Sequence, residues 1–157
     1  MSPLTIPATS PTKYLSGVVA LNLPADGTSG DWHYEQTFLR PRTRTPRTFL
    51  AGDGQPTDTS LLLGEAGIYD CSAALDRLGI AHPAGPVYAA DHVRAVADLV
   101  LGSLLRGERA NHVVLDEWMP EVPDQRRVFT LLERARSRLR PGLQALVDTW
   151  IAANRTE

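Results

Sequence analysis

The sequence predicts an α+β fold: a small, mostly antiparallel sheet from the N-terminal half, covered by a C-terminal layer of three to four helices. Apolar residues alternate with period two in the first half, and apolar positions recur with helical spacing in the second half. Strand patterns precede helix patterns, which argues against alternating βαβ units and a doubly wound nucleotide fold. The 157 residues, 43% of them hydrophobic and 22% charged, predict one domain, 1–157, with a real core.

The N-terminal half is expected to begin with a flexible leader, residues 1–13, which contains three prolines. Residues that suit a pleated surface then predict strands at 14–23 and 32–39. Turn-forming residues lie between these two segments, so we expect them to pair as a hairpin. Short apolar segments at 48–51 and 60–63 predict two further strands.

The firmest helix prediction covers residues 91–106. Asp91 is placed to cap its first turn, and Gly107 to take a left-handed conformation after its end. Arg94 and Asp98 are expected to form an i, i+4 pair on the outer face. The apolar positions match an amphipathic helix: Val93, Val96, Ala97, Val100, Leu101 and Leu104.

Three more helices are predicted. A short one covers 72–78 and ends at Gly79, and a longer one covers 124–140. Pro141 and Gly142 interrupt the pattern before a last helix at 143–151.

Composition excludes several classes of protein. A net charge of -2 gives no global basis for binding nucleic acid or a membrane surface, so any such binding must be local. Lys13 is the only lysine, which leaves no residue for a Walker A loop or a Schiff base. The single cysteine, Cys71, excludes an intramolecular disulfide, and no apolar stretch is long enough to span a membrane. We therefore expect a cytoplasmic protein.

The most suggestive local site is Asp31-Trp32-His33, because Asp31 and His33 would project from the same face of a strand. This geometry would suit proton transfer or metal binding in a small enzyme. The other histidines lack metal-ligand spacing, so no metal and no cofactor are predicted. The alternative is that His33 is a surface or hydrogen-bonded residue.

A second arrangement joins Cys71 to His92 as a nucleophile and a base. No catalytic signature surrounds the cysteine, and free cysteine usually behaves as a small buried hydrophobic residue. No catalytic residue is therefore assigned.

Arginine clusters occur in two places. Residues 40–47 are expected to form an exposed basic loop that carries Arg40, Arg42, Arg44 and Arg47. Residues 124–140 contain six arginines and two acids, and a stripe opposite the apolar face consists of Arg127, Arg134 and Arg138. Each cluster could be an ordinary solvated face. Together they point to a charged protein partner or a nucleic acid.

Three segments, 14–24, 30–33 and 88–95, resemble small bacterial proteins associated with toxin–antitoxin or mobile loci. They read YLSGVVALNLP, GDWH and YAADHVRA in that order. The resemblance implies an accessory bacterial protein and assigns a role to no residue.

These observations favour a non-catalytic cytoplasmic protein-binding module, such as the antitoxin or a companion of a toxin pair. Two alternatives stay open: a nucleic-acid-binding protein that uses the 40–47 arm, and a small enzyme or metal protein centred on Asp31 and His33. A homo-oligomer is compatible with any of them, and no membrane association is expected.

Overall fold

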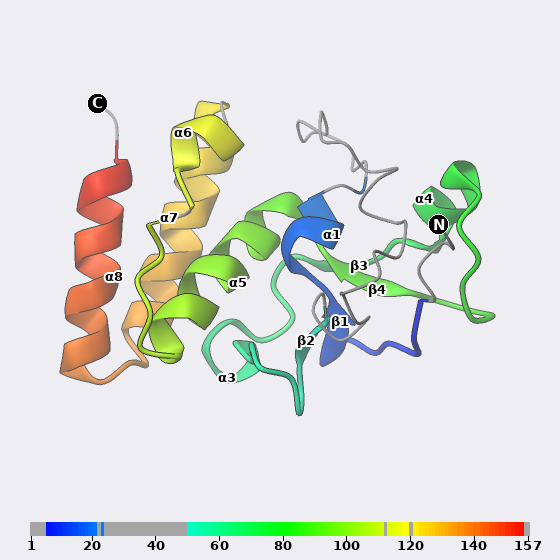
Figure 1. Ribbon diagram of the computed structural model, residues 1–157, viewed down its shortest axis with the longest axis horizontal. Helices are drawn as coiled ribbons and strands as arrows, with labels where there is room; N and C mark the ends of the chain where they lie inside the picture. Colours follow the sequence, from blue (N-terminus) through cyan, green and yellow to red (C-terminus); the bar gives the residue numbers. More distant parts are fainter. Residues whose placement is uncertain (1–5, 22, 24–49, 112, 120, 156–157) are drawn as a thin grey trace.

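A computed structural model of the chain describes residues 6–21, 23, 50–111, 113–119 and 121–155 (Figure 1). In chain order the elements are β1 (Lys13–Leu15), α1 (Gly17–Leu21), β2 (Leu50–Gly52), α3 (Ser60–Leu63), β3 (Ile68–Asp70), α4 (Ser72–Leu78), β4 (Tyr88–Ala90), α5 (His92–Leu105), α6 (Leu115–Trp118), α7 (Val122–Arg136) and α8 (Pro141–Asn154). The predicted α+β class is confirmed, because a small sheet packs against the helices of the C-terminal half.

The four strands form one mixed sheet in the order β2-β1-β4-β3. The outer pairs, β1 with β2 and β3 with β4, are antiparallel, whereas the central pair, β1 with β4, is parallel. The sheet is thus mostly antiparallel, as predicted. The order along the chain differs from the prediction, because the short helices α1, α3 and α4 alternate with the strands.

The two faces of the sheet belong to different hydrophobic clusters. Tyr14, Ala51 and Ala90 lie in the larger cluster together with residues of α5, α7 and α8. Their chain neighbours Leu15, Leu50 and Ala89 lie in a smaller cluster with Leu75 of α4. This division follows from the period of two along a strand. Figure 1 shows α4 at one end of the molecule, then the sheet and α5, with α7 and α8 at the other end.

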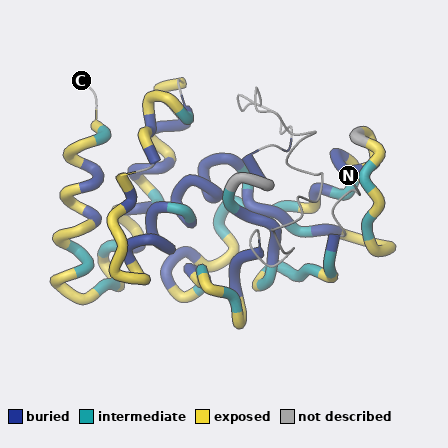
Figure 2. Tube along the Cα trace, viewed as in Figure 1, coloured by how far each residue is buried: buried dark blue, intermediate teal, exposed yellow. Residues whose placement is uncertain are grey.

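The predicted central helix is confirmed as α5, and it is the most buried element of the chain. All of its 14 residues are buried except Leu99 and Leu105 (Figure 2). Asp91 caps its first turn by accepting a hydrogen bond from the Arg94 backbone N–H at 2.8 Å. Gly107 takes the predicted left-handed conformation with φ 78°.

The predicted position of Arg94 and Asp98 on the outer face is wrong. They form the i, i+4 pair, with Arg94 Nε 3.0 Å from Asp98 Oδ1, but both side chains are buried. The prediction assumed that α5 has a solvent face. In the structure the sheet, α1, α7 and α8 surround this helix.

Two strand predictions are also wrong. The strand expected at 14–23 ends at Leu15, because Gly17 has φ 64° and starts α1. Residues 60–63 form α3, where the Asp58 carboxylate accepts from the Ser60 backbone N–H at 3.0 Å and sets the turn that precedes the helix. The expected strand at 48–51 corresponds to β2 in its described part.

The C-terminal helices agree with the prediction except at their ends. The short helix at 72–78 is α4, and the helices expected at 124–140 and 143–151 are α7 and α8. Pro141 begins α8, which suits its fixed φ at the first helical position. Phe129 of α7 and Trp150 of α8 join the two helices with ring centroids 6.4 Å apart.

Part of the expected leader is packed against the protein. Ile6 is buried in the cluster beneath α4, and the Thr9 hydroxyl accepts a hydrogen bond from the Tyr88 backbone N–H at 2.9 Å. The strand expected at 32–39, its hairpin, and the basic loop at 40–47 lie outside the described residues.

Candidate functional site

The most extensive polar cluster in the described interior surrounds Asp98 of α5. Its Oδ2 accepts hydrogen bonds from the Tyr14 hydroxyl at 2.7 Å and the Ser16 hydroxyl at 2.8 Å. Its Oδ1 accepts from the Thr59 hydroxyl at 2.5 Å and from Arg94 Nε at 3.0 Å. We call these five residues the Asp98 cluster. It ties β1, the start of α1 and the start of α3 to the central helix.

Arg94 uses all five of its N–H donors within this environment. Besides Asp98, it donates to the Gly64 and Ala66 carbonyls at 3.0 and 2.6 Å, and to the Tyr14 and Thr59 hydroxyl oxygens. Its guanidinium also lies 5.5 Å from the centre of the Tyr14 ring. The buried charge is therefore fully paired and hydrogen-bonded.

The Asp98 cluster has the character of a structural anchor. Burial raises the pKa of Tyr14, and the Asp98 carboxylate raises it further, so the phenol stays a neutral donor. A cavity of about 50 Å³ beside Ser16, Thr57 and Asp98 has room for water but not for a substrate. With every cluster hydroxyl and every guanidinium N–H already engaged, the cluster offers no free group for chemistry.

Cys71 and His92 do not have the environments of a nucleophile and a base. Burial is the main cause that raises the pKa of the Cys71 thiol to about 12, so the thiolate is scarce at neutral pH. The His92 ring is buried, and its Nε2–H donates to the Leu23 carbonyl at 2.6 Å. We assign both residues to the core.

The other candidate residues of the N-terminal half, Asp31, Trp32 and His33, lie outside the described residues, as do Arg40, Arg42, Arg44 and Arg47. Their roles stay predictions. Among the residues that are described, no group of three or more His, Cys, Asp or Glu side chains is placed to hold a metal ion.

The second arginine cluster lies on α7 and the turn that follows it, and all three of its predicted members are exposed. Arg127 lies 3.6 Å from the Asp124 carboxylate, and Arg138 donates to the Leu61 carbonyl at 2.8 Å. Within the described part of the chain, Arg134 and Arg138 form no ion pair with a carboxylate. The stripe therefore presents positive charge to solvent.

A groove of about 530 Å³ runs along α7 beside this stripe and reaches the end of α8. We call it the α7 groove; its lining residues include Val122, Arg126, Phe129, Glu133 and Arg155. Arg155 covers the Phe129 ring at 5.0 Å and donates to Glu133 at 3.1 Å. Arg126 forms no ion pair among the described residues. The groove thus combines apolar surface with a cation free to pair.

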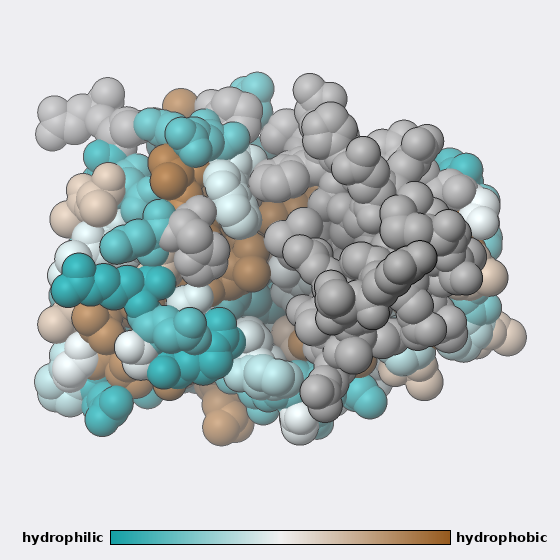
Figure 3. All heavy atoms as spheres, viewed as in Figure 1, coloured by the Kyte–Doolittle hydropathy of each residue, from teal (hydrophilic) through white to brown (hydrophobic). Residues whose placement is uncertain are grey.

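A second groove, of about 550 Å³, separates α8 from the segment that follows α5. We call it the α8 groove; its lining residues include Leu104, Arg109, Val114, Leu146, Trp150 and Ala153. Leu146 and Val114 are 38% and 39% exposed. Figure 3 shows hydrophobic surface between the helices at this end of the molecule. Both grooves therefore lie in the outer helical layer.

The arginine stripe was predicted from the sequence, whereas the burial of Arg94 and Asp98 was not. Arg126, Arg109 and the two grooves were not predicted either. The available signal for a buried pair was the low polarity of the helix around it, because α5 contains no other Asp, Glu, Lys or Arg. No local signal marked the grooves, which form between segments distant in sequence.

Comparisons with known proteins give no match, whether to a family model, to a curated protein or to a solved structure. Among the described residues, no helix is both long and apolar enough to cross a membrane.

Proposed function

We propose that this chain is a non-catalytic cytoplasmic protein-binding module that recognises an acidic partner through the exposed side of α7. The observation that carries the proposal is the α7 groove, where Arg126, which has no ion pair among the described residues, lies beside the exposed Val122 above the buried Phe129. Protein interfaces combine apolar anchors with charges that steer the partner, and the groove supplies both.

The charges around the groove favour an acidic partner. Residues 124–140 carry six arginines and two acids within a chain whose net charge is -2. Asp124 and Glu133, the two acids, each lie beside an arginine. The exposed surface of α7 is thus basic, and an acidic protein surface complements it.

The main alternative is a nucleic acid bound along Arg127, Arg134 and Arg138. Their exposure favours it, because phosphate binding needs accessible cations. The lining of the α7 groove favours a protein instead. Glu133 would repel a phosphate backbone, and Val122, which is 52% exposed, would gain nothing from phosphate contacts.

The resemblance to proteins of toxin–antitoxin loci supports a toxin encoded next to this chain as the first partner to test. The two proteins are co-expressed with one tag, and we expect a complex of fixed stoichiometry. Arg126→Glu combined with Arg134→Glu should abolish co-purification, because it reverses two charges on the basic surface. Arg77→Glu is the matched control, since Arg77 is exposed on α4 at the other end of the molecule.

Failure of the neighbouring product to co-purify would contradict the proposal. A nucleic acid as the true ligand would be recognised by its salt dependence. Binding of a labelled duplex would then weaken by orders of magnitude between about 50 and 200 mM salt. The same double variant would abolish that binding.

A further inference from the structure

Helix α8 has very little charge anywhere on its surface. Asp148 is the single charged residue among its 14, and its carboxylate is bonded to Arg136 of α7 at 2.7 and 2.9 Å. Only Val147, Trp150 and Ile151 are fully buried in the core. The outward side is exposed and uncharged, with Gly142, Ala145, Leu146, Thr149, Ala152 and Ala153 at i, i+3, i+4, i+7, i+10 and i+11.

This pattern is unusual for a helix at the edge of a molecule. A surface helix normally carries charged residues opposite its apolar face, and a helix without them is normally buried. Figure 2 shows the outer side of α8 exposed along its length. The outward side of α8 therefore lacks the charged residues that a solvated helix face normally carries.

The α8 groove continues this exposed side and sets the size of the segment that fits. Along α8 its lining runs from Leu146 to Asn154. At about 1.5 Å per residue this span is about 12 Å, or roughly two helical turns. A partner helix of that length presents anchors at i, i+3 or i+4, and i+7 to an apolar groove.

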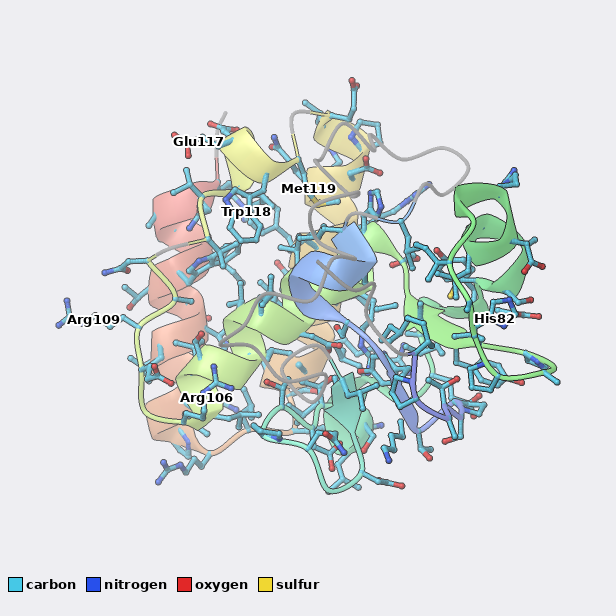
Figure 4. All side chains as sticks on the ribbon, turned by 45° about the vertical axis from the view of Figure 1, so that its right-hand side comes forward. His82, Arg106, Arg109, Glu117, Trp118 and Met119 are labelled. Carbon is cyan, nitrogen blue, oxygen red and sulfur yellow. The ribbon has the colours of Figure 1, made fainter. Side chains whose placement is uncertain are left out.

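The charges in the groove distinguish between possible occupants. Arg109 is the one charged side chain among its described lining residues, and it forms no ion pair in the described part of the chain. In Figure 4, Arg109 extends away from the body of the molecule. A second copy of this chain would bring another Arg109, and the outward side of α8 offers no carboxylate to pair with either. A different protein with a carboxylate at this position would complement it.

We propose that the α8 groove binds an amphipathic helix of a partner protein, whose apolar side contacts Leu146, Val114 and Ala153 and whose carboxylate pairs with Arg109. This inference rests on the proposed function, in which the partner is an acidic protein. It adds a second contact surface and the chemistry of the segment that occupies it.

The test uses two labelled, hydrocarbon-stapled helical peptides of about 15 residues and the full chain. Both peptides carry leucines at i, i+4 and i+7, flanked in one by glutamate and in the other by lysine. Fluorescence anisotropy should give a Kd for the glutamate peptide about tenfold lower than for the lysine peptide. Arg109→Glu should reverse this preference.

The decisive variant is Leu146→Glu, which places a charge in the groove and should weaken the glutamate peptide at least tenfold. Leu61→Glu is the matched control. It makes the same change at an exposed leucine of α3 outside the groove, and should leave the Kd unchanged. Circular dichroism of each variant establishes that it is folded.

Absence of binding by both peptides, equal binding of both, or an equal effect of the two leucine variants would overturn the inference. A homodimer detected by analytical ultracentrifugation would also overturn it if Leu146→Glu dissociated the dimer and Leu61→Glu did not. The occupant of the α8 groove would then be a second copy of this chain. The proposed function is tested separately, by co-purification of the co-expressed partner. If a co-expressed partner binds but neither Leu146→Glu nor Arg109→Glu affects the complex, the groove inference alone is wrong.

Discussion

Replacing Asp98 by asparagine should destabilise the fold more than any other isosteric change of a described acidic residue. Asp98 accepts four hydrogen bonds with two oxygens, and asparagine offers one oxygen in the same place. The NH₂ group would face hydroxyl or guanidinium donors, and the Arg94 charge would lose its counter-ion.

The size of the effect follows from burial. Removing one partner of a buried ion pair costs about 3 to 5 kcal/mol, and each orphaned buried donor costs about 1 to 3 kcal/mol. These costs overlap, so we expect a loss of about 4 kcal/mol from a total of about 5 to 15 kcal/mol. With a urea m value of about 2 kcal/mol/M, the unfolding midpoint should fall by about 2 M.

Urea denaturation followed by far-UV circular dichroism measures this change. The matched control is Asp148→Asn, which makes the same replacement in the exposed Arg136 pair, where solvent screens the interaction. Its midpoint should stay close to that of the unmodified protein. A shift for Asp98→Asn below about 0.5 M, corresponding to about 1 kcal/mol, would show that the Asp98 cluster does not anchor the strands and short helices to α5.

Three further outcomes follow from the contacts of single residues. Raising the pH should lower the Tm through His82, whose two ring nitrogens lie 2.8 Å from the Pro83 carbonyl and the Asp76 carboxylate. These contacts raise the pKa of His82, so the stability that it contributes is complete below about pH 6.5 and is lost as the pH rises through the folded-state pKa. His82→Gln should flatten this pH dependence of the Tm, and an unchanged slope would contradict the prediction. Gly67→Ala should lower the free energy of unfolding by more than about 1 kcal/mol, because Gly67 has φ 77° and an added Cβ would lie 2.7 Å from Arg94 Cβ. Gly79→Ala should lower it less, since Gly79 has a similar φ of 74° but open space around it. Equal losses for the two variants would show that the close approach to Arg94 has no effect. Cys71 should react with a thiol reagent only after unfolding, because the thiol is buried and burial raises its pKa to about 12. Rapid labelling of the native protein would contradict this, since it would show that the thiol is accessible.

Helical spacing in the sequence was sufficient to predict the main helices. The apolar positions of α5 and its cap at Asp91 are correct because period and capping are local properties. The helices at 17–21 and 60–63 were not predicted. There, β-branched or leucine-rich composition suggested strands, whereas the left-handed Gly17 and the turn set by Asp58 produce helices.

The candidate site was predictable only in part. The arginine stripe on α7 follows from its spacing, and its members are exposed as expected. Whether the Arg94–Asp98 pair faces solvent depends on how many elements surround α5, which is a tertiary property. The α7 and α8 grooves also depend on tertiary structure. Arg155 and Phe129 line one groove, and Val114 and Leu146 line the other, although each pair is distant in sequence.

The most direct test of the central claim, that the outer helical layer binds an acidic protein, is amide hydrogen exchange of the chain alone and in its co-expressed complex. The partner should slow exchange in 107–114 and at the exposed ends of α7 and α8, and should leave exchange in α4 and β3 unchanged. Slowing confined to α4 and β3, with α7 and α8 exchanging as in the free chain, would contradict it.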